Sequence, residues 1–153
     1  MDYQLLKALH LLGVILFLGN IIVTALWKAY ADRTGTISVI AFSQRLVTVT
    51  DFAFTATGAA IIAISGRIMS AELGHSITPY WLTMGWVLFI ASGIIWAVIL
   101  IPVQIKQARM AKLFEVEGVI PDRYWHLSKY WYTFGLIATI LPMANLYFMV
   151  FKP

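Results

Sequence analysis

Residues 3–27 read YQLLKALHLLGVILFLGNIIVTALW, an apolar run interrupted only by a few polar side chains. A helix needs roughly 20 residues to cross a hydrocarbon core about 30 Å thick, so this run predicts a transmembrane helix. It is too long, and lacks the basic flank, for a cleaved signal peptide. Lys7 and His10 lie three residues apart on one face of this helix. Ionisable side chains in such a segment are costly, which indicates a functional role.

Three further apolar stretches follow, at about residues 51–69, 80–103 and 131–151. They are continuously apolar, whereas the strands of a membrane barrel alternate over about ten residues. The whole chain of 153 residues is 61% hydrophobic and 12% charged, with a mean hydropathy of +0.83. Such a composition does not suit a soluble domain. The sequence therefore predicts one all-α membrane domain over residues 1–153, a polytopic bundle of four transmembrane helices.

The composition also limits the chemistry of any bound group. The chain has no cysteine, which excludes disulfides, thiolate metal sites, iron–sulfur clusters and covalent haem attachment. Its net charge of +4 is better explained by membrane orientation than by nucleic-acid binding. The expected surroundings are the lipid bilayer, with no nucleic-acid partner.

The distribution of basic residues predicts an orientation. Eight lysines and arginines flank the first and third loops, against three at the opposite side. The positive-inside rule then places those two loops in the cytoplasm and both termini outside. The eight are Lys28, Arg33, Arg45, Lys106, Arg109, Lys112, Arg123 and Lys129, and the three are Lys7, Arg67 and Lys152.

Two segments between the apolar stretches have a helical pattern. Residues 36–50 carry an apolar stripe that either lies in the inner interface or lengthens the second helix. Residues 104–117 carry basic side chains spaced by three and end before Gly118, which indicates a solvated extension of the third helix. Helices 2 and 3 are therefore expected to extend on the cytoplasmic side. The stripe consists of Val39, Phe42, Leu46 and Val49, and the basic residues are Lys106, Arg109 and Lys112.

Small residues and one proline suggest how the helices pack. Small side chains recur every four residues on helices 2, 3 and 4, where they let neighbouring backbones approach closely. Pro142 lies inside the fourth apolar stretch, where it either kinks the helix or frees a carbonyl toward the bundle. The small residues are Thr55, Ala59 and Ala63, then Gly93 and Ala97, then Gly135 and Thr139.

Polar residues recur on one face of the first helix, which should point into the bundle. The residues of this face, two of them the polar Asn20 and Thr24, lie at offsets of three, seven, ten and fourteen from His10. A histidine beside a glycine is a plausible axial ligand for haem, because the flat ring needs close approach to the backbone. The alternative is a histidine that is hydrogen-bonded in a packed core. The face consists of His10, Gly13, Phe17, Asn20 and Thr24.

Two other ionisable positions are candidates. Asp51 begins the second apolar stretch, with Arg45 below it. Its carboxylate either relays protons or pairs with a basic residue from another helix, or it interacts as an N-terminal residue with the helix dipole. His75 lies in the short outer loop, on the same side as His10, and is a weaker candidate for a second ligand.

Residues 7–19, KALHLLGVILFLG, resemble the first helix of the bacterial four-helix membrane protoporphyrinogen oxidases and the related copper-resistance membrane proteins. The resemblance continues at residues 44–46 (QRL), at residues 63–66 and at Trp81-Leu82. A closer likeness is to uncharacterised predicted integral membrane proteins that share the Lys-x-x-His start, the aspartate of helix 2 and the run Pro102-Val103-Gln104. These resemblances imply a four-helix protein of the bacterial inner membrane.

The oxidase resemblance implies b-type haem bound through His10, with Lys7 as a functional basic residue. The oxidases place a histidine and a lysine after the Trp-Leu of helix 3, where this chain has Thr83-Met84-Gly85. They also place a histidine after helix 1, where this chain has Lys28-Ala29-Tyr30-Ala31. The oxidase reaction itself is therefore not implied.

Three functional hypotheses follow. In a haem-binding redox protein, His10 ligates iron and Lys7 pairs with a propionate. Asn20 and Thr24 then tune that site. In a small transporter or metal-handling protein, His10, Asp51 and Asn20 line a polar pathway. In an accessory subunit of a larger membrane complex, or a homo-oligomer, Lys7 and His10 only fix helix 1.

Overall fold

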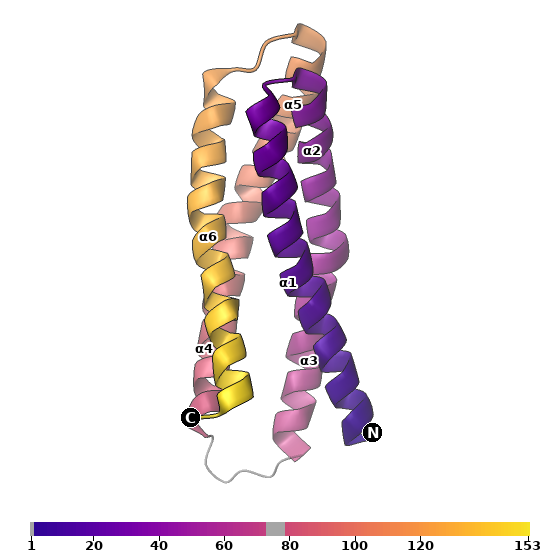
Figure 1. Ribbon diagram of the computed structural model, residues 1–153, viewed down its shortest axis with the longest axis vertical. Coiled ribbons are helices and arrows are strands. Elements are labelled where there is room, and N and C mark those ends of the chain that lie inside the picture. The colour runs from indigo at the N-terminus through magenta and orange to yellow at the C-terminus, as the bar shows by residue number, and fades with distance from the viewer. Residues whose placement is uncertain (1, 73–78) are drawn as a thin grey trace.

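The computed structural model describes residues 2–72 and 79–153, which form a bundle of four long helices (Figure 1). No strand occurs among those residues. All four helices are long and apolar enough to cross a membrane, so the predicted four-helix membrane fold is confirmed. In chain order the elements are α1 (Tyr3–Thr34), α2 (Ile37–Thr50), the π-helical turn η1 (Asp51–Ala56), α3 (Thr57–Glu72), α4 (Tyr80–Ile95), the π-helical turn η2 (Trp96–Leu100), α5 (Ile101–Glu117) and α6 (Asp122–Phe151).

The bundle has two distinct ends. Both chain termini lie at one end, here the terminal end, and the connections α1–α2 and α5–α6 lie at the other, here the loop end (Figure 1). At the loop end, α1 and α5 each stop at a glycine with positive φ, +62° at Gly35 and +75° at Gly118. Glycine tolerates this left-handed conformation without a steric penalty, which lets both helices end there.

The helices are longer than the apolar stretches that predicted them. The second long helix, α2–η1–α3, has 36 residues, and the third, α4–η2–α5, has 38. The third is therefore about 57 Å long, well beyond a hydrocarbon core of about 30 Å. The first and fourth helices also extend at the loop end, to Thr34 and from Asp122. Hydropathy alone underestimates them, because the added turns contain polar residues that are buried between helices.

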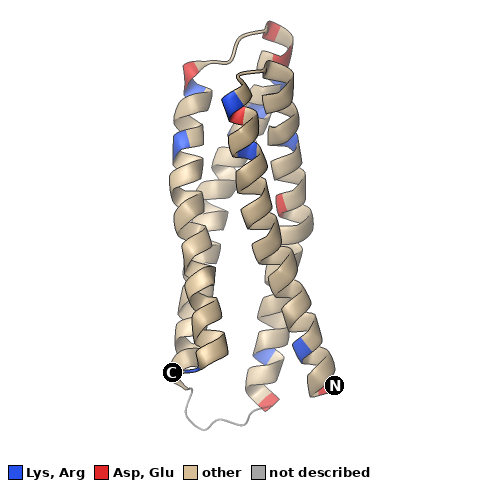
Figure 2. Ribbon diagram, in the orientation of Figure 1, with Lys and Arg blue, Asp and Glu red and all other residues tan. Residues whose placement is uncertain are grey.

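The two expected extensions are both helical. α2 runs directly into η1 and α3, so the alternative in which residues 36–50 lengthen the second helix is confirmed. Its apolar stripe faces outward, with Phe42 60% and Val49 64% exposed, while Gln44 on the opposite face is fully buried. α5 continues to Glu117 with its three basic residues exposed. Figure 2 shows charged residues gathered toward the two ends of the bundle.

The closest helix approach joins α1 to α3 through two glycines. A Cβ atom added to Gly58 lies 2.8 Å from the Gly13 carbonyl oxygen and 2.8 Å from the Phe17 amide nitrogen. Small residues thus bring the α1 and α3 backbones together, which is the kind of contact that the sequence predicts, although Gly13 and Gly58 are not among the small residues named for it. The prediction is wrong for Gly93 and Gly135, because an added Cβ meets nothing within 4 Å at either position.

Pro142 acts through the carbonyl that it leaves without an intrahelical donor. Proline has no backbone N–H, so the carbonyl four residues earlier, at Ala138, loses its usual partner. Ser92 Oγ on α4 donates to this Ala138 oxygen at 2.8 Å. The predicted freed carbonyl is confirmed, and it joins α4 to α6.

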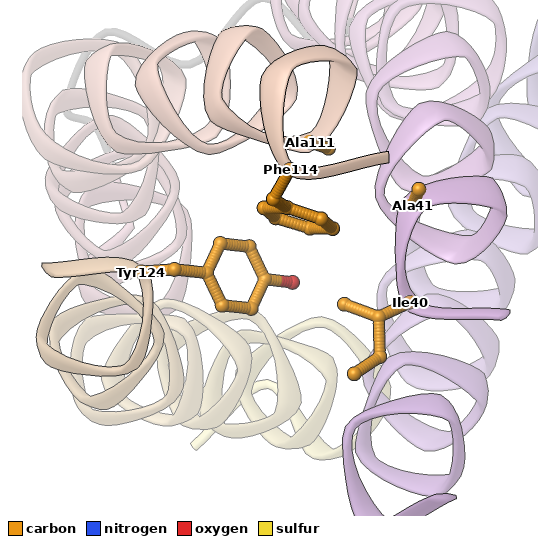
Figure 3. Packing of buried hydrophobic residues seen from close by; sticks show 5 residues of the cluster. All are labelled: Ile40, Ala41, Ala111, Phe114 and Tyr124. Atoms are coloured by element: carbon orange, nitrogen blue, oxygen red, sulfur yellow. The ribbon is translucent and has the colours of Figure 1, made fainter. Parts of the chain in front are cut away.

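The apolar core at the loop end joins α2, α5 and α6. Ile40, Ala41, Ala111, Phe114 and Tyr124 are almost fully buried there. The Phe114 and Tyr124 rings meet edge to face, with centroids 5.3 Å apart. Figure 3 shows the Tyr124 hydroxyl pointing into the space between the helices. This core closes the bundle beyond the apolar spans.

Candidate functional site

The bundle divides into two helix pairs toward its terminal end. α1 packs against α3 and α4 packs against α6, whereas in the described part of the chain no Cα atom of α3 lies within 8 Å of a Cα atom of α4 or α6. A cleft of about 400 Å³ lies between the pairs. We call it the terminal cleft. Its lining includes Lys7, His10, Gly66, Trp86, Asn145 and Met149.

His10 is held against one wall of the terminal cleft by a chain of hydrogen bonds. His10 Nδ1 lies 3.0 Å from Ser65 Oγ, and Ser65 Oγ donates to the Ile61 carbonyl oxygen at 2.5 Å. Because the serine has one proton and gives it to Ile61, the histidine donates from Nδ1. His10 Nε2 then keeps its lone pair, the state that a ligating or proton-accepting imidazole needs.

A glycine provides room for the imidazole ring. A Cβ atom added to Gly66 lies 3.3 Å from His10 Cε1, closer than ordinary van der Waals contact. Ser65 and Gly66 thus hold the ring through adjacent residues of α3. The resemblance at residues 63–66 did not reveal their contact with His10, because that contact joins two different helices.

The mouth of the terminal cleft is basic. Lys7 is exposed and lines the cleft from α1. Lys152 also lines it and lies 5.1 Å from the centroid of the Trp81 ring. His75, the weaker candidate ligand, lies outside the described residues. The ammonium groups of Lys7 and Lys152 therefore both lie at the terminal end of the cleft, one from each helix pair.

The opposite wall of the terminal cleft is built by α4 and α6. Asn145 Oδ1 is buried there without a hydrogen-bond partner among the described residues. A Cβ atom added to Gly85 would overlap the Met149 side chain and lie 3.1 Å from Asn145 Oδ1. Gly85 belongs to the segment where the chain departs from the oxidase pattern. Here it makes room for a thioether and an unpaired amide oxygen.

A second cavity, here the central cavity, adjoins the terminal cleft. It has a volume of about 490 Å³ and is lined by residues of all four long helices. Phe17 and Phe89 line both spaces, and their ring centroids lie 6.2 Å apart. This aromatic pair separates the two spaces.

Asp51 lies at the wall of the central cavity and is 7% exposed. Its Oδ1 accepts from Asn20 Nδ2 at 3.2 Å and Thr55 Oγ1 at 2.9 Å. Its Oδ2 accepts from Trp96 Nε1 at 3.2 Å and Gln104 Nε2 at 2.8 Å. The carboxylate thus joins the two π-helical turns, η1 and η2, and all four donors are neutral.

Two of the alternatives for Asp51 are wrong. The helix runs without interruption through Asp51, so this residue is not at a helix N-terminus. Nor does Asp51 pair with a basic residue from another helix, because no ion pair of the described residues includes it. Arg45 instead forms an exposed ion pair with Glu115 at 2.5 Å. The apolar stretch begins at Asp51, whereas the helix that contains it begins at Ile37.

Thr24 lines the central cavity and Asn20 binds two residues of its wall, while neither lines the terminal cleft. Asn20 binds Asp51 and Thr55, while Thr24 is 2% exposed and donates to the Asn20 carbonyl oxygen at 2.7 Å. The predicted inward face of α1 is correct, but ten residues of helix separate His10 from Asn20 by about 15 Å. One face therefore serves two sites.

Lys28 corrects the charge count, because it is fully buried rather than a surface charge. Its Nζ lies 3.1 Å from Asp32 Oδ2 and 3.0 Å from Tyr124 Oη. It lies 5.0 to 5.7 Å from the ring centroids of Tyr124, Trp131 and Tyr132. Seven basic residues then remain at the loop end against three. The sequence does contain a signal that Lys28 is buried. Lys28 follows Thr24 by four residues, about one helical turn, and so lies on the same inward face of α1.

Three buried glutamines fill the rest of the loop-end interior. Gln44, Gln104 and Gln107 are at most 1% exposed. Gln107 Nε2 donates to Ser128 Oγ at 2.8 Å. Gln44 Nε2, Gln104 Oε1 and Gln107 Oε1 are buried without partners among the described residues. Such polar atoms are usually satisfied by internal water, so we expect ordered water between α2 and α5.

Residues 2–72 and 79–153 contain no group of three or more histidine or acidic side chains that could hold a metal ion.

No curated protein and no solved structure matches the chain. Residues 4–153 match a family model described as predicted integral membrane protein (DUF2269). The resemblance to the oxidases and copper-resistance proteins rests on the quoted residues alone. The match covers nearly the whole chain, and the protein belongs to the DUF2269 family of integral membrane proteins.

Proposed function

We propose that this protein binds b-type haem in the terminal cleft, where His10 Nε2 would hold the iron, and takes part in electron transfer in the membrane. The observation that carries the proposal is the hydrogen-bond chain from His10 through Ser65 to the Ile61 carbonyl. It orients the imidazole and fixes the proton on Nδ1. Outer partners of this kind are typical of histidines that ligate metals.

The surroundings of His10 suit the group. The cleft volume of about 400 Å³ lies in the range of small-molecule sites. Met149 supplies a thioether from the other helix pair, and histidine with methionine is a known axial pair for haem iron. Lys7 and Lys152 at the mouth suit carboxylates such as propionates. Haem bound there would supply one-electron transfer, and the chain would supply ligation and exclude water.

The test is the absorption spectrum of the full-length protein, purified from a haem-replete host and measured oxidised and dithionite-reduced. We expect a Soret band in the parent and its loss in His10→Ala, with partial rescue by added imidazole. His126→Ala is the matched control, because His126 is exposed in the other half of the bundle, and it should keep the band. Ser65→Ala should bind haem about 10- to 100-fold more weakly.

Haem binding by His10→Ala equal to that of the parent would refute the assignment. A colourless parent that purifies only with a larger complex would favour the accessory-subunit hypothesis instead. Metal-dependent flux without a chromophore would favour the transporter hypothesis.

We also propose that the protein lies in the bacterial inner membrane with its loop end in the cytoplasm. The support is the excess of basic residues at the loop end, seven against three, once Lys28 is counted as buried. The chain has no native cysteine, so single cysteines report topology cleanly. In intact cells permeable at the outer membrane, an impermeant maleimide should label Asp2→Cys and not Glu117→Cys. The opposite pattern would reverse the orientation.

A further inference from the structure

We infer that the central cavity binds a lipophilic organic cation, attracted by the Asp51 carboxylate. The inference concerns a different site from the proposed haem and does not depend on it. The cavity of about 490 Å³ has one acidic group in its wall, and the remaining lining is largely aromatic, aliphatic or small. The Asp51 carboxylate, the aromatic lining of the cavity and its opening toward the lipid each indicate this class of ligand.

Among the described residues, the buried Asp51 carboxylate has no cationic partner. The four groups that donate to it are two amides, a hydroxyl and an indole. Lys28 and Asp32 pair with each other at 3.1 Å, so their charges largely cancel. No basic nitrogen of the described residues lies within 4 Å of the Asp51 carboxylate. A charge in such a weakly polar interior attracts a cation strongly.

The wall of the cavity suits an organic cation better than a metal ion. Five aromatic side chains line it, and aromatic faces attract organic ammonium-type ions. Hard metal ions instead require several oxygen ligands, and among the described residues no acidic cluster gathers there. The aromatic side chains are Phe17, Phe89, Trp96, Trp131 and Tyr132.

The backbone keeps the cavity open. Gly93 and Gly135 line it, and an added Cβ meets nothing within 4 Å at either position. The π-helical turns η1 and η2 meet at the same place through the Trp96–Asp51 hydrogen bond. Turns of this kind weaken regular helix geometry and are frequent at functional sites. Two of them at one carboxylate indicate that the cavity has a function.

The cavity opens toward the lipid. Ile22 and Leu26 on α1 are 41% and 54% exposed, and Leu136 on α6 is 63% exposed, and all three line it. These apolar side chains lie on the outer surface of the bundle, where the membrane would cover them. A ligand that partitions into the bilayer can therefore enter between α1 and α6.

The experiment measures binding of tetraphenylphosphonium to the full-length protein in lipid nanodiscs by isothermal titration calorimetry, with empty nanodiscs as the blank. Tetraphenylborate, which has the same shape and the opposite charge, is titrated separately. We expect saturable binding of the cation to the parent and none of the anion. Equal binding of the two ions would overturn the inference.

Three variants locate the binding. Asp51→Asn should raise the Kd for the cation at least about tenfold. Gly93→Leu should do the same by filling the cavity while leaving Asp51 in place, and it keeps the test decisive if Asp51→Asn does not fold. Gly19→Leu is the matched control, because Gly19 also has open space around it but lines neither cavity. Parent-like affinity in folded Gly93→Leu, or the same loss in Gly19→Leu, would refute the site.

Discussion

The two halves of this bundle are built from the same four helices but have opposite interiors. Toward the terminal end, the helices separate into pairs and enclose two adjoining spaces of about 400 and 490 Å³. Toward the loop end, buried polar side chains and an aromatic core join the helices. The difference teaches that the proposed ligand sites lie in the open half, while the buried polar network and the loop-end core lie in the closed half. Variants in the two halves should therefore fail in different ways.

The largest expected effect is on stability, from Lys28→Met. Removing the lysine leaves Asp32 as a buried charge without its cationic partner, which costs about 3–5 kcal/mol. Lys106→Met, at an exposed position on α5, should change the free energy of unfolding little. The measurement is unfolding by SDS titration in mixed micelles.

The double variant Lys28→Met/Asp32→Asn tests the reason for that loss. It removes both charges while keeping an acceptor for Tyr132 Oη, which now donates to Asp32 at 2.7 Å. It should recover most of the lost stability. If Lys28→Met is as stable as Lys106→Met, the buried pair does not join the loop half.

An intermediate effect is expected from Gly58→Ala, which lies where α1 and α3 meet. The added methyl group would meet backbone atoms at 2.8 Å, and such overpacking costs about 1–3 kcal/mol. Gly93→Ala is the matched control, since its methyl group enters open space and should be neutral or slightly stabilising. Equal melting temperatures for the two variants would contradict the contrast between tight packing and open cavity.

The smallest expected effect is from Ser92→Ala, which removes the donor to the Ala138 carbonyl. The loss should be about 1 kcal/mol. In a Pro142→Ala background the new backbone N–H can bind that carbonyl, so the same serine change should cost less. A double-mutant cycle measures the difference. An unchanged cost of Ser92→Ala would show that the proline does not create the need for the serine.

Much of the fold was predictable because each transmembrane helix is encoded in its own stretch of sequence. Apolar runs gave the four helices, and Gly118 gave the end of the third. The inward face of helix 1 was also predictable, since Gly13, Phe17 and Thr24 are all buried. Local periodicity is sufficient for such features.

The remaining features depend on which helices touch, and a single sequence does not contain that information. Lys28 resembled a loop charge, because Tyr124, which its Nζ contacts, and Tyr132, whose ring it faces, lie about a hundred residues away. Asn20 was assigned to the His10 site, because nothing local identified Asp51 as its partner. Gly93 was expected to face a helix and instead faces a cavity.

The most direct test of the division between the halves is to measure haem content and melting temperature together in His10→Ala and Lys28→Met. We predict that His10→Ala loses the Soret band while its apoprotein melts close to the apoprotein of the parent. Lys28→Met should melt well below the parent yet keep the parent ratio of haem to folded protein. Haem retained in His10→Ala, or lost from folded Lys28→Met, would contradict the account.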